Sequence, residues 1–118
     1  ESGAGWIPAA LETMDWQWRN GGVTVDHPEY ELLPSEYFRR QIYGCFWFEQ
    51  EGARFALDQY PDNLMYETDY PHPTCQHPGP RTPAQFPRDY ATDALGGLDD
   101  DVLAKVLHDT AAKVYGLR

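Results

Sequence analysis

Two short apolar runs, separated by one helical pattern, constrain the fold of this chain more than any other feature. The first run, QIYGCFWF, is rich in β-branched and aromatic residues and predicts a strand over residues 42–48. It does not alternate cleanly between apolar and polar residues, which is typical of a parallel strand covered on both faces. Residues 49–60 carry apolar side chains at helical spacing, and NLMYET predicts a second strand over residues 63–68. Because parallel strands need a crossover connection, the sequence predicts a parallel βαβ unit in an α/β fold.

Helical patterns occupy most of the remaining chain. Pro8 suits the first position of a helix over residues 7–19, and Asp99 suits the N-cap of a continuous helix over residues 99–116. Shorter helical segments are expected at residues 34–40 and 89–95, whereas residues 23–33 are mixed and polar. The helices therefore outnumber the two predicted strands.

Two parallel strands with several amphipathic helices do not make an independent α/β domain, because their apolar edges would stay exposed. The chain also opens on Glu1 rather than on Met. We therefore expect residues 1–118 to be the C-terminal part of a larger α/β fold. Within it, residues 71–88 carry six prolines and predict one long irregular loop. Loops of this length in compact domains are usually functional or disordered.

The composition excludes several classes of partner. The net charge is −10, from 19 acidic against 9 basic residues, so a nucleic-acid partner is not expected. No apolar run approaches the ~18 residues that suggest a membrane span. The two cysteines make no disulfide framework, and Cys45 lies in an apolar run and is expected to be a buried thiol. These features together predict a cytoplasmic protein.

Asp69 follows the second predicted strand directly and precedes a Tyr-Pro dipeptide. Aspartate is favoured in turns, so the residue has a purely structural interpretation. The carboxyl ends of parallel strands are also where α/β folds hold their chemistry, so the same carboxylate is a candidate for a site. The residue pattern alone leaves both interpretations open.

Three motifs, in order along the chain, resemble the amidohydrolase-2 family. The segment ESGAGWIP at residues 1–8, with Glu12 and Asp15 after it, is similar to the family's E-G-G-x-G-W-x-P…E-R-x-D pattern. TDYPH at residues 68–72 resembles its [ST]-D-Y-P-H signature, and KVYGL at residues 113–117 resembles its C-terminal ending. The family comprises metal-dependent enzymes related to aminocarboxymuconate semialdehyde decarboxylase, and the resemblance spans essentially the whole chain.

The resemblance implies a (β/α)₈ TIM barrel, of which this chain is roughly the last quarter to third. Residues 42–48 and 63–68 would be its seventh and eighth strands, and Glu1 would stand at the end of the sixth. The family's N-terminal H-x-H pair and its further His ligand have no counterpart in this chain. By this resemblance the chain would need the missing N-terminal part of the barrel as its partner, and a homo-oligomer is also possible.

The resemblance also implies roles for individual residues. Asp69 would bind a divalent metal, Zn or alternatively Mn, and would take a proton from metal-bound water. Glu1 would be a second catalytic acid or base, unless it is simply an exposed chain start. His72 would contact substrate or hydrogen-bond the turn, and Trp6 would form a wall of the substrate pocket or pack in the core.

The implied function is part of a metal-dependent enzyme that acts on a small carboxylated organic substrate. The reaction would be hydrolysis or non-oxidative decarboxylation, so the enzyme would be a hydrolase or a carboxy-lyase. This segment alone would be inactive. The alternative is a non-catalytic, truncated subunit that completes or binds another barrel.

Overall fold

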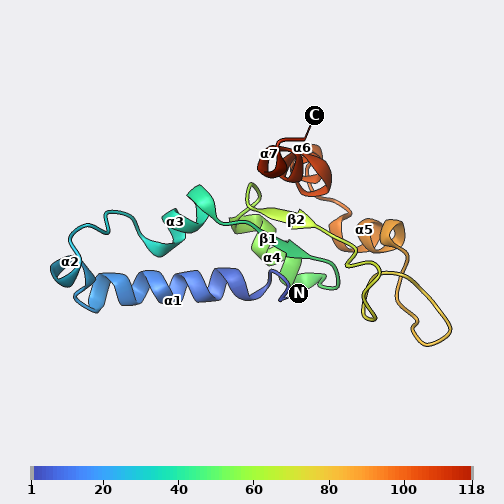
Figure 1. Cartoon of the computed structure of the whole chain (residues 1–118), viewed down its shortest axis with the longest axis horizontal. Coiled ribbons are helices and arrows are strands. Elements are labelled where there is room, and N and C mark those ends of the chain that lie inside the picture. The colour runs from blue at the N-terminus through green and yellow to red at the C-terminus, as the bar shows by residue number, and fades with distance from the viewer. Residues whose placement is uncertain (1, 118) are drawn as a thin grey trace.

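The computed structural model describes residues 2–117 and contains the predicted βαβ unit (Figure 1). Strand β1 (Gly44–Phe46) pairs in parallel with β2 (Leu64–Tyr66), with Gly44 opposite Leu64. Helix α4 (Glu51–Gln59) makes the crossover between them. The prediction of a parallel α/β unit is therefore confirmed.

Both strands are shorter than predicted, since each contains three residues. Beyond Phe46, the backbone carbonyl of Trp47 accepts a hydrogen bond from the Gln76 side chain instead of from a neighbouring strand. At the other end, the Asn63 side chain donates to the carbonyl of Ile42 at 2.9 Å. Side-chain amides thus replace a neighbouring strand as the hydrogen-bond partners at both ends of the ladder, and the strands end there.

A long arm precedes the sheet. Helix α1 (Trp6–Asn20) extends away from the strands, α2 (Val23–Asp26) lies at the far end, and α3 (Pro34–Gln41) returns beside α1 (Figure 1). This arm contributes to overall extents of 56 × 33 × 26 Å. Within residues 23–33, which are mixed and polar in sequence, the left-handed Gly22 (φ 77°) precedes a single helical turn.

Helices α1 and α3 are joined by one buried carboxylate. Asp15 accepts hydrogen bonds from the Ser35 backbone N–H at 2.9 Å and from its hydroxyl at 2.6 Å. Ser35 lies in the first turn of α3, where backbone N–H groups have no partner within the helix. Asp15 therefore fixes the start of α3 on α1.

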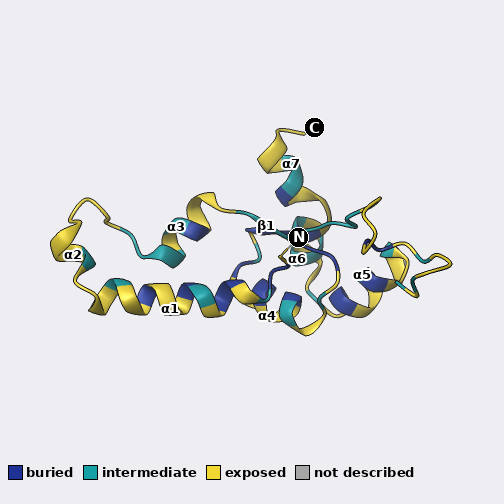
Figure 2. Cartoon of the chain, turned by 60° about the horizontal axis from the view of Figure 1, so that its bottom comes forward, coloured by how far each residue is buried: buried dark blue, intermediate teal, exposed yellow. Residues whose placement is uncertain are grey.

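The core lies between the sheet and its helices (Figure 2). Six large side chains in it are almost fully buried: Phe46, Ile7, Leu57, Leu64, Leu95 and Val106. Side chains alternate along a strand, so Cys45 points away from the face that carries Phe46. The prediction that Cys45 is fully buried was wrong, because it lies on this opposite face and is half-buried.

The C-terminal part forms helix α5 (Pro87–Leu95) and then one unbroken helical stretch. The predicted helix over residues 99–116 is confirmed, with a π-helical turn within it: α6 (Asp100–Ala104), η1 (Lys105–Asp109) and α7 (Thr110–Tyr115) follow one another directly. Asp99 stands at the N-cap as predicted, although its side chain makes no capping hydrogen bond.

The π turn has a visible consequence for packing. It places Val106 and Thr110 in buried positions, at 1% and 4% exposure, on the side that faces β2. Lys105 on the same turn forms an ion pair with Asp62 at 2.8 Å. The wider turn thus lets the C-terminal helix dock on the sheet. In the part of the chain that is described, no helix has the length and apolarity needed to cross a membrane.

Candidate functional site

The loops that follow β1 and β2 emerge from the same edge of the sheet, because the two strands are parallel. Glu49 comes three residues after β1, and Asp69 comes three residues after β2. In barrels built of parallel strands, this edge is where catalytic side chains gather. The candidate site is therefore built from the two loops that begin here.

Asp69 has an unusual backbone conformation. Its φ is 57°, and it is the only residue other than glycine with positive φ among those described. The carbonyl of Asp69 accepts a hydrogen bond from the His72 N–H at 2.8 Å, which closes a turn over a cis Tyr70–Pro71 bond. A left-handed aspartate is uncommon, and such conformations cluster at functional sites. The interpretation of Asp69 as a turn residue is thus correct for its backbone. The turn is closed by the backbone carbonyl, so it does not use the carboxylate.

The carboxylate of Asp69 has an unsatisfied oxygen. Its Oδ2 atom is buried and has no hydrogen-bond partner among the described residues. His72 Nδ1 lies 3.1 Å away, which is close enough for an ion pair, but the geometry is not that of a hydrogen bond. The same Nδ1 lies 3.0 Å from Thr74 Oγ1. A buried acceptor without a partner calls for a cation, a proton or a donor supplied from elsewhere.

This donor set fits a divalent metal, because a carboxylate oxygen is a suitable ligand for Zn or Mn. Residues 2–117 contain no group of three or more His, Cys, Asp or Glu side chains placed to hold an ion. The described residues therefore supply fewer than three ligands at Asp69, and the others would have to come from outside them.

Glu1 lies outside the described residues, but the segment after it is held tightly by Glu49. The carboxylate of Glu49 accepts hydrogen bonds from the backbone N–H groups of Ala4 and Gly5, both at 2.7 Å. Gly3 has a φ of 70°, and a Cβ atom there would come within 2.4 Å of Glu49 Oε2. This Gly3–Gly5 segment is thus shaped around the carboxylate.

Sequence reasoning missed Glu49, although a signal was present. Like Asp69, it is a carboxylate placed directly after a predicted buried strand. Its backbone carbonyl accepts a hydrogen bond from the hydroxyl of Tyr90, which is 2% exposed. Glu49 thereby links the start of α1, the end of β1 and helix α5.

A second network ties the Pro-rich loop to the strand ends. The side chain of Gln76 donates to the carbonyl of Trp47 and accepts from the hydroxyl of Tyr66. The rings of Tyr66 and Tyr90 stack with centroids 5.6 Å apart. Burial raises the pKa of Tyr66 to about 12, so its hydroxyl remains a neutral donor. The loop therefore starts from a fixed position, and it ends at Phe86, since α5 begins at Pro87.

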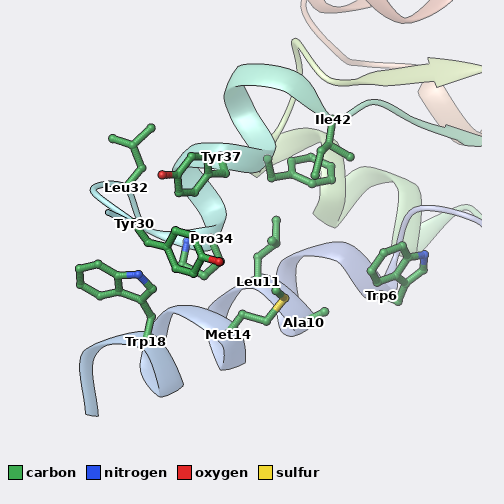
Figure 3. A pocket seen from close by; sticks show the side chains of 11 residues that line it. Trp6, Ala10, Leu11, Met14, Trp18, Tyr30, Leu32, Pro34, Tyr37 and Ile42 are labelled. Carbon is green, nitrogen blue, oxygen red and sulfur yellow. The ribbon is translucent and has the colours of Figure 1, made fainter. Parts of the chain in front are cut away.

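Of the two sequence expectations for Trp6, the structure excludes core packing. Trp6 is 53% exposed, so it is not a core residue, and its indole N–H donates to the Gly3 carbonyl at 2.9 Å. Figure 3 shows it at one end of an apolar groove along α1, with Trp18 at the other end. The groove has a volume of about 520 Å³ and is lined from α1 and from residues 30–42. None of the lining residues belongs to the loop that carries Asp69 and His72.

The other tryptophans divide in the same way. Trp47 is buried, at 5% exposure. Trp16 is 59% exposed and does not belong to the core. Trp18 is half-buried, and its indole N–H has no partner among the described residues.

Comparison with known proteins gives the family. A family model described as Amidohydrolase matches residues 3–117, which is nearly the whole chain. The chain belongs to this amidohydrolase family. The resemblance noted from the three sequence motifs is thereby confirmed. Among curated proteins, none matches the chain significantly.

A solved structure supports the same conclusion about the fold. The chain is similar to the crystal structure of 5-carboxyvanillate decarboxylase LigW from Sphingomonas paucimobilis, with 25% sequence identity and a TM-score of 0.70. The match covers 98% of this chain and 33% of that chain, so this amidohydrolase chain spans about a third of its solved relative. The fold is therefore a partial barrel, as the strand count indicated.

Proposed function

We propose that this chain is part of a metal-dependent amidohydrolase-like enzyme that acts on a small carboxylated organic molecule. The reaction is hydrolysis or non-oxidative decarboxylation. The observation that carries the proposal is the buried Oδ2 of Asp69 at the carboxyl end of β2, which accepts no hydrogen bond from the described residues. Membership of an amidohydrolase family and similarity to a solved decarboxylase support it.

Asp69 would hold the divalent metal, with zinc the first choice and manganese the second. Such an ion lowers the pKa of bound water and polarises bound carbonyl or carboxylate groups. The Oδ2 atom of Asp69, which accepts no hydrogen bond from the described residues, is the group that would receive the proton. His72 contacts this oxygen at 3.1 Å and so orients the carboxylate for either role.

Glu1 and Trp6 take secondary roles in this proposal. Glu1 would serve as a second acid or base, and the grip of Glu49 on the backbone of Ala4 and Gly5 would limit how far its segment can move. Trp6, which is half exposed, would contact the substrate. On its own the chain would be inactive, because the described residues supply fewer than three metal ligands.

Metal content tests the proposal. The complete protein should purify with about one divalent ion per chain, measured by mass spectrometry of the elements, and Asp69→Ala should lose it. Asp100→Asn changes an exposed carboxylate on α6 and is the matched control, which should keep the metal. If Asp69→Ala retains metal at the level of Asp100→Asn, the role of Asp69 as a ligand is refuted.

One observation favours a second candidate function. The sheet has two strands, so within residues 2–117 both outer edges lack a partner strand. Unpaired edges are templates for pairing with another chain. The chain would then be a non-catalytic subunit that completes or binds another barrel, or that assembles with copies of itself. Co-purification of a separate barrel chain, with metal content indifferent to Asp69→Ala, would favour this function over the enzyme.

A further inference from the structure

The sheet has an inner face, opposite the one that packs against α4, and this inner face carries the carboxylate Glu67. Phe46 and Leu64 point from the other face into the core that they share with α4. Cys45 pairs with Met65 in the strand register, and because side chains alternate along a strand, both lie on the inner face. The backbone N–H of Glu67 donates to the Phe46 carbonyl at 3.0 Å, so the ladder continues and Glu67 falls on the same face as Met65.

The Glu67 carboxylate lies half-buried beside the thiol of Cys45. Burial raises the pKa of Cys45, and the negative charge of Glu67 raises it further, so the thiol stays neutral. Met65, the next residue back on the inner face, is buried at 6% exposure and carries no charge. Among the described residues, none donates a hydrogen bond to the Glu67 carboxylate and none pairs with it as a cation. Within residues 2–117 this negative charge therefore has no counter-charge.

A complete barrel encloses the inner face. The chain spans a third of its solved relative, and the interior of a parallel barrel is filled by layers of side chains that its different strands contribute. A carboxylate enclosed in such a layer costs free energy unless a cation and hydrogen-bond donors meet it. Cys45 and Met65 supply no positive charge, so a cation at the level of Glu67 has to come from another strand of the barrel.

The chemistry of the inner face indicates which cation this is. A metal ion needs three or more ligands, and the described residues contain no group of three His, Cys, Asp or Glu side chains placed to hold one. Asp69, two residues further along the chain, turns away from the strand geometry with a φ of 57°. A single carboxylate matches a single basic side chain, which pairs with it through charge-assisted hydrogen bonds.

We infer that the inner face docks the rest of the barrel through a lysine or arginine side chain, which comes from another barrel strand and pairs with the Glu67 carboxylate. The inference goes beyond the proposed function, because it concerns how the barrel is completed and requires neither the metal nor a substrate. Such a pair also fixes the register of the docking strand, since a slip by one residue would turn the basic side chain to the other face.

Replacement of Glu67 in the complete protein tests the inference by urea unfolding. Glu67→Gln keeps the size of the side chain and removes its charge, so it leaves the basic group enclosed without a partner, and the unfolding equilibrium constant should rise about a hundredfold. Glu67→Met should cost at least as much, although methionine suits the apolar neighbours. Glu67→Asp keeps the charge and should cost least. Glu31→Gln, at an exposed position in the arm, is the matched control and should change the constant by no more than about twofold.

Three outcomes would overturn the inference. If Glu67→Met is as stable as the unmodified protein or more stable, no cation faces Glu67, because an apolar side chain is then preferred on the inner face. Equal losses in Glu67→Asp and Glu67→Gln, including failure of both to fold, would assign the effect to packing and not to charge. If folded Glu67→Gln loses its metal as completely as Asp69→Ala does, the cation is the metal ion. Retention of metal by Asp69→Ala would refute the proposed metal ligand and leave the result for Glu67 unaffected.

Discussion

Replacing Glu49 with alanine should loosen the start of α1 and destabilise the complete protein. The side chain accepts two hydrogen bonds at 2.7 Å, from the backbone N–H groups of Ala4 and Gly5. Ala4 is fully buried, so its N–H would lose the Glu49 carboxylate as its acceptor without gaining water. A buried donor left unpaired costs about 1–3 kcal/mol, and a carboxylate at a helix N-terminus contributes about 0.3–1 kcal/mol more. We therefore expect Glu49→Ala to lower the free energy of unfolding by about 3 kcal/mol.

Glu49→Gln is the graded control. The amide keeps one acceptor oxygen and nearly the same volume, but it turns an NH₂ group toward one of the two backbone donors. Its cost should be about half that of Glu49→Ala, near 1.5 kcal/mol. The same carboxylate also restricts Gly3, since a Cβ atom there would lie 2.4 Å from Glu49 Oε2. Gly3→Ala alone should therefore destabilise the protein. Part of this cost should disappear in the double variant that also carries Glu49→Ala.

Urea unfolding gives the stability change, and hydrogen exchange of the peptide that contains residues 3–8 locates it. Exchange in this peptide should speed up in Glu49→Ala, while peptides from α3 should change no more than global stability requires. The reasoning is refuted if Glu49→Ala unfolds within about 0.5 kcal/mol of the unmodified protein, the range typical of surface changes. Full additivity of Gly3→Ala and Glu49→Ala would contradict the contact between them.

Two further predictions concern buried polar groups. Burial raises the pKa of Tyr66 to about 12, above the ordinary value of about 10, so its stability contribution is complete below pH 10 and is lost as the pH rises toward 12. Urea midpoints from pH 8 to pH 12 should fall less steeply in Tyr66→Phe than in Tyr115→Phe, whose ring is 68% exposed; equal slopes would contradict this. Asn63→Ala should cost about 2–3 kcal/mol, because the Asn63 amide donates to three carbonyls at the end of α3, whereas Asn20→Ala on the surface of α1 should cost under about 0.5 kcal/mol. Similar thermal midpoints for these two variants would refute the role of Asn63.

The sequence predicted the βαβ unit well, because periodicity reports burial directly. It overestimated strand lengths, since the residues that end the ladder, Asn63 and Gln76, do so through side-chain amides that no local pattern reveals. It also missed the π turn at Lys105–Asp109, because the turn follows from docking on β2 and not from helix propensity.

The candidate site could likewise be predicted only in part. Asp69 could be found from its place after a strand, and the family motif gave it a chemical role. The sequence could not show that Oδ2 of Asp69 is buried without a hydrogen-bond donor, because this depends on how His72 and Thr74 lie in the turn. Glu49 was equally visible by position, but its importance depends on a backbone segment about 45 residues earlier in the chain.

The arm formed by α1, α2 and α3 gives the chain an unusually high ratio of surface to mass. Its accessible surface is 7900 Å² for 13.5 kDa, whereas the scaling for compact monomers gives about 6,500 Å². The excess, about 1,400 Å², exceeds what one partner contributes to a protein–protein interface of standard size, about 800 Å². Trp6, Met14 and Trp16, which lie along α1, are each more than half exposed, so the arm presents apolar side chains to solvent. The isolated chain should therefore self-associate, and its apparent molecular mass in solution should rise with protein concentration.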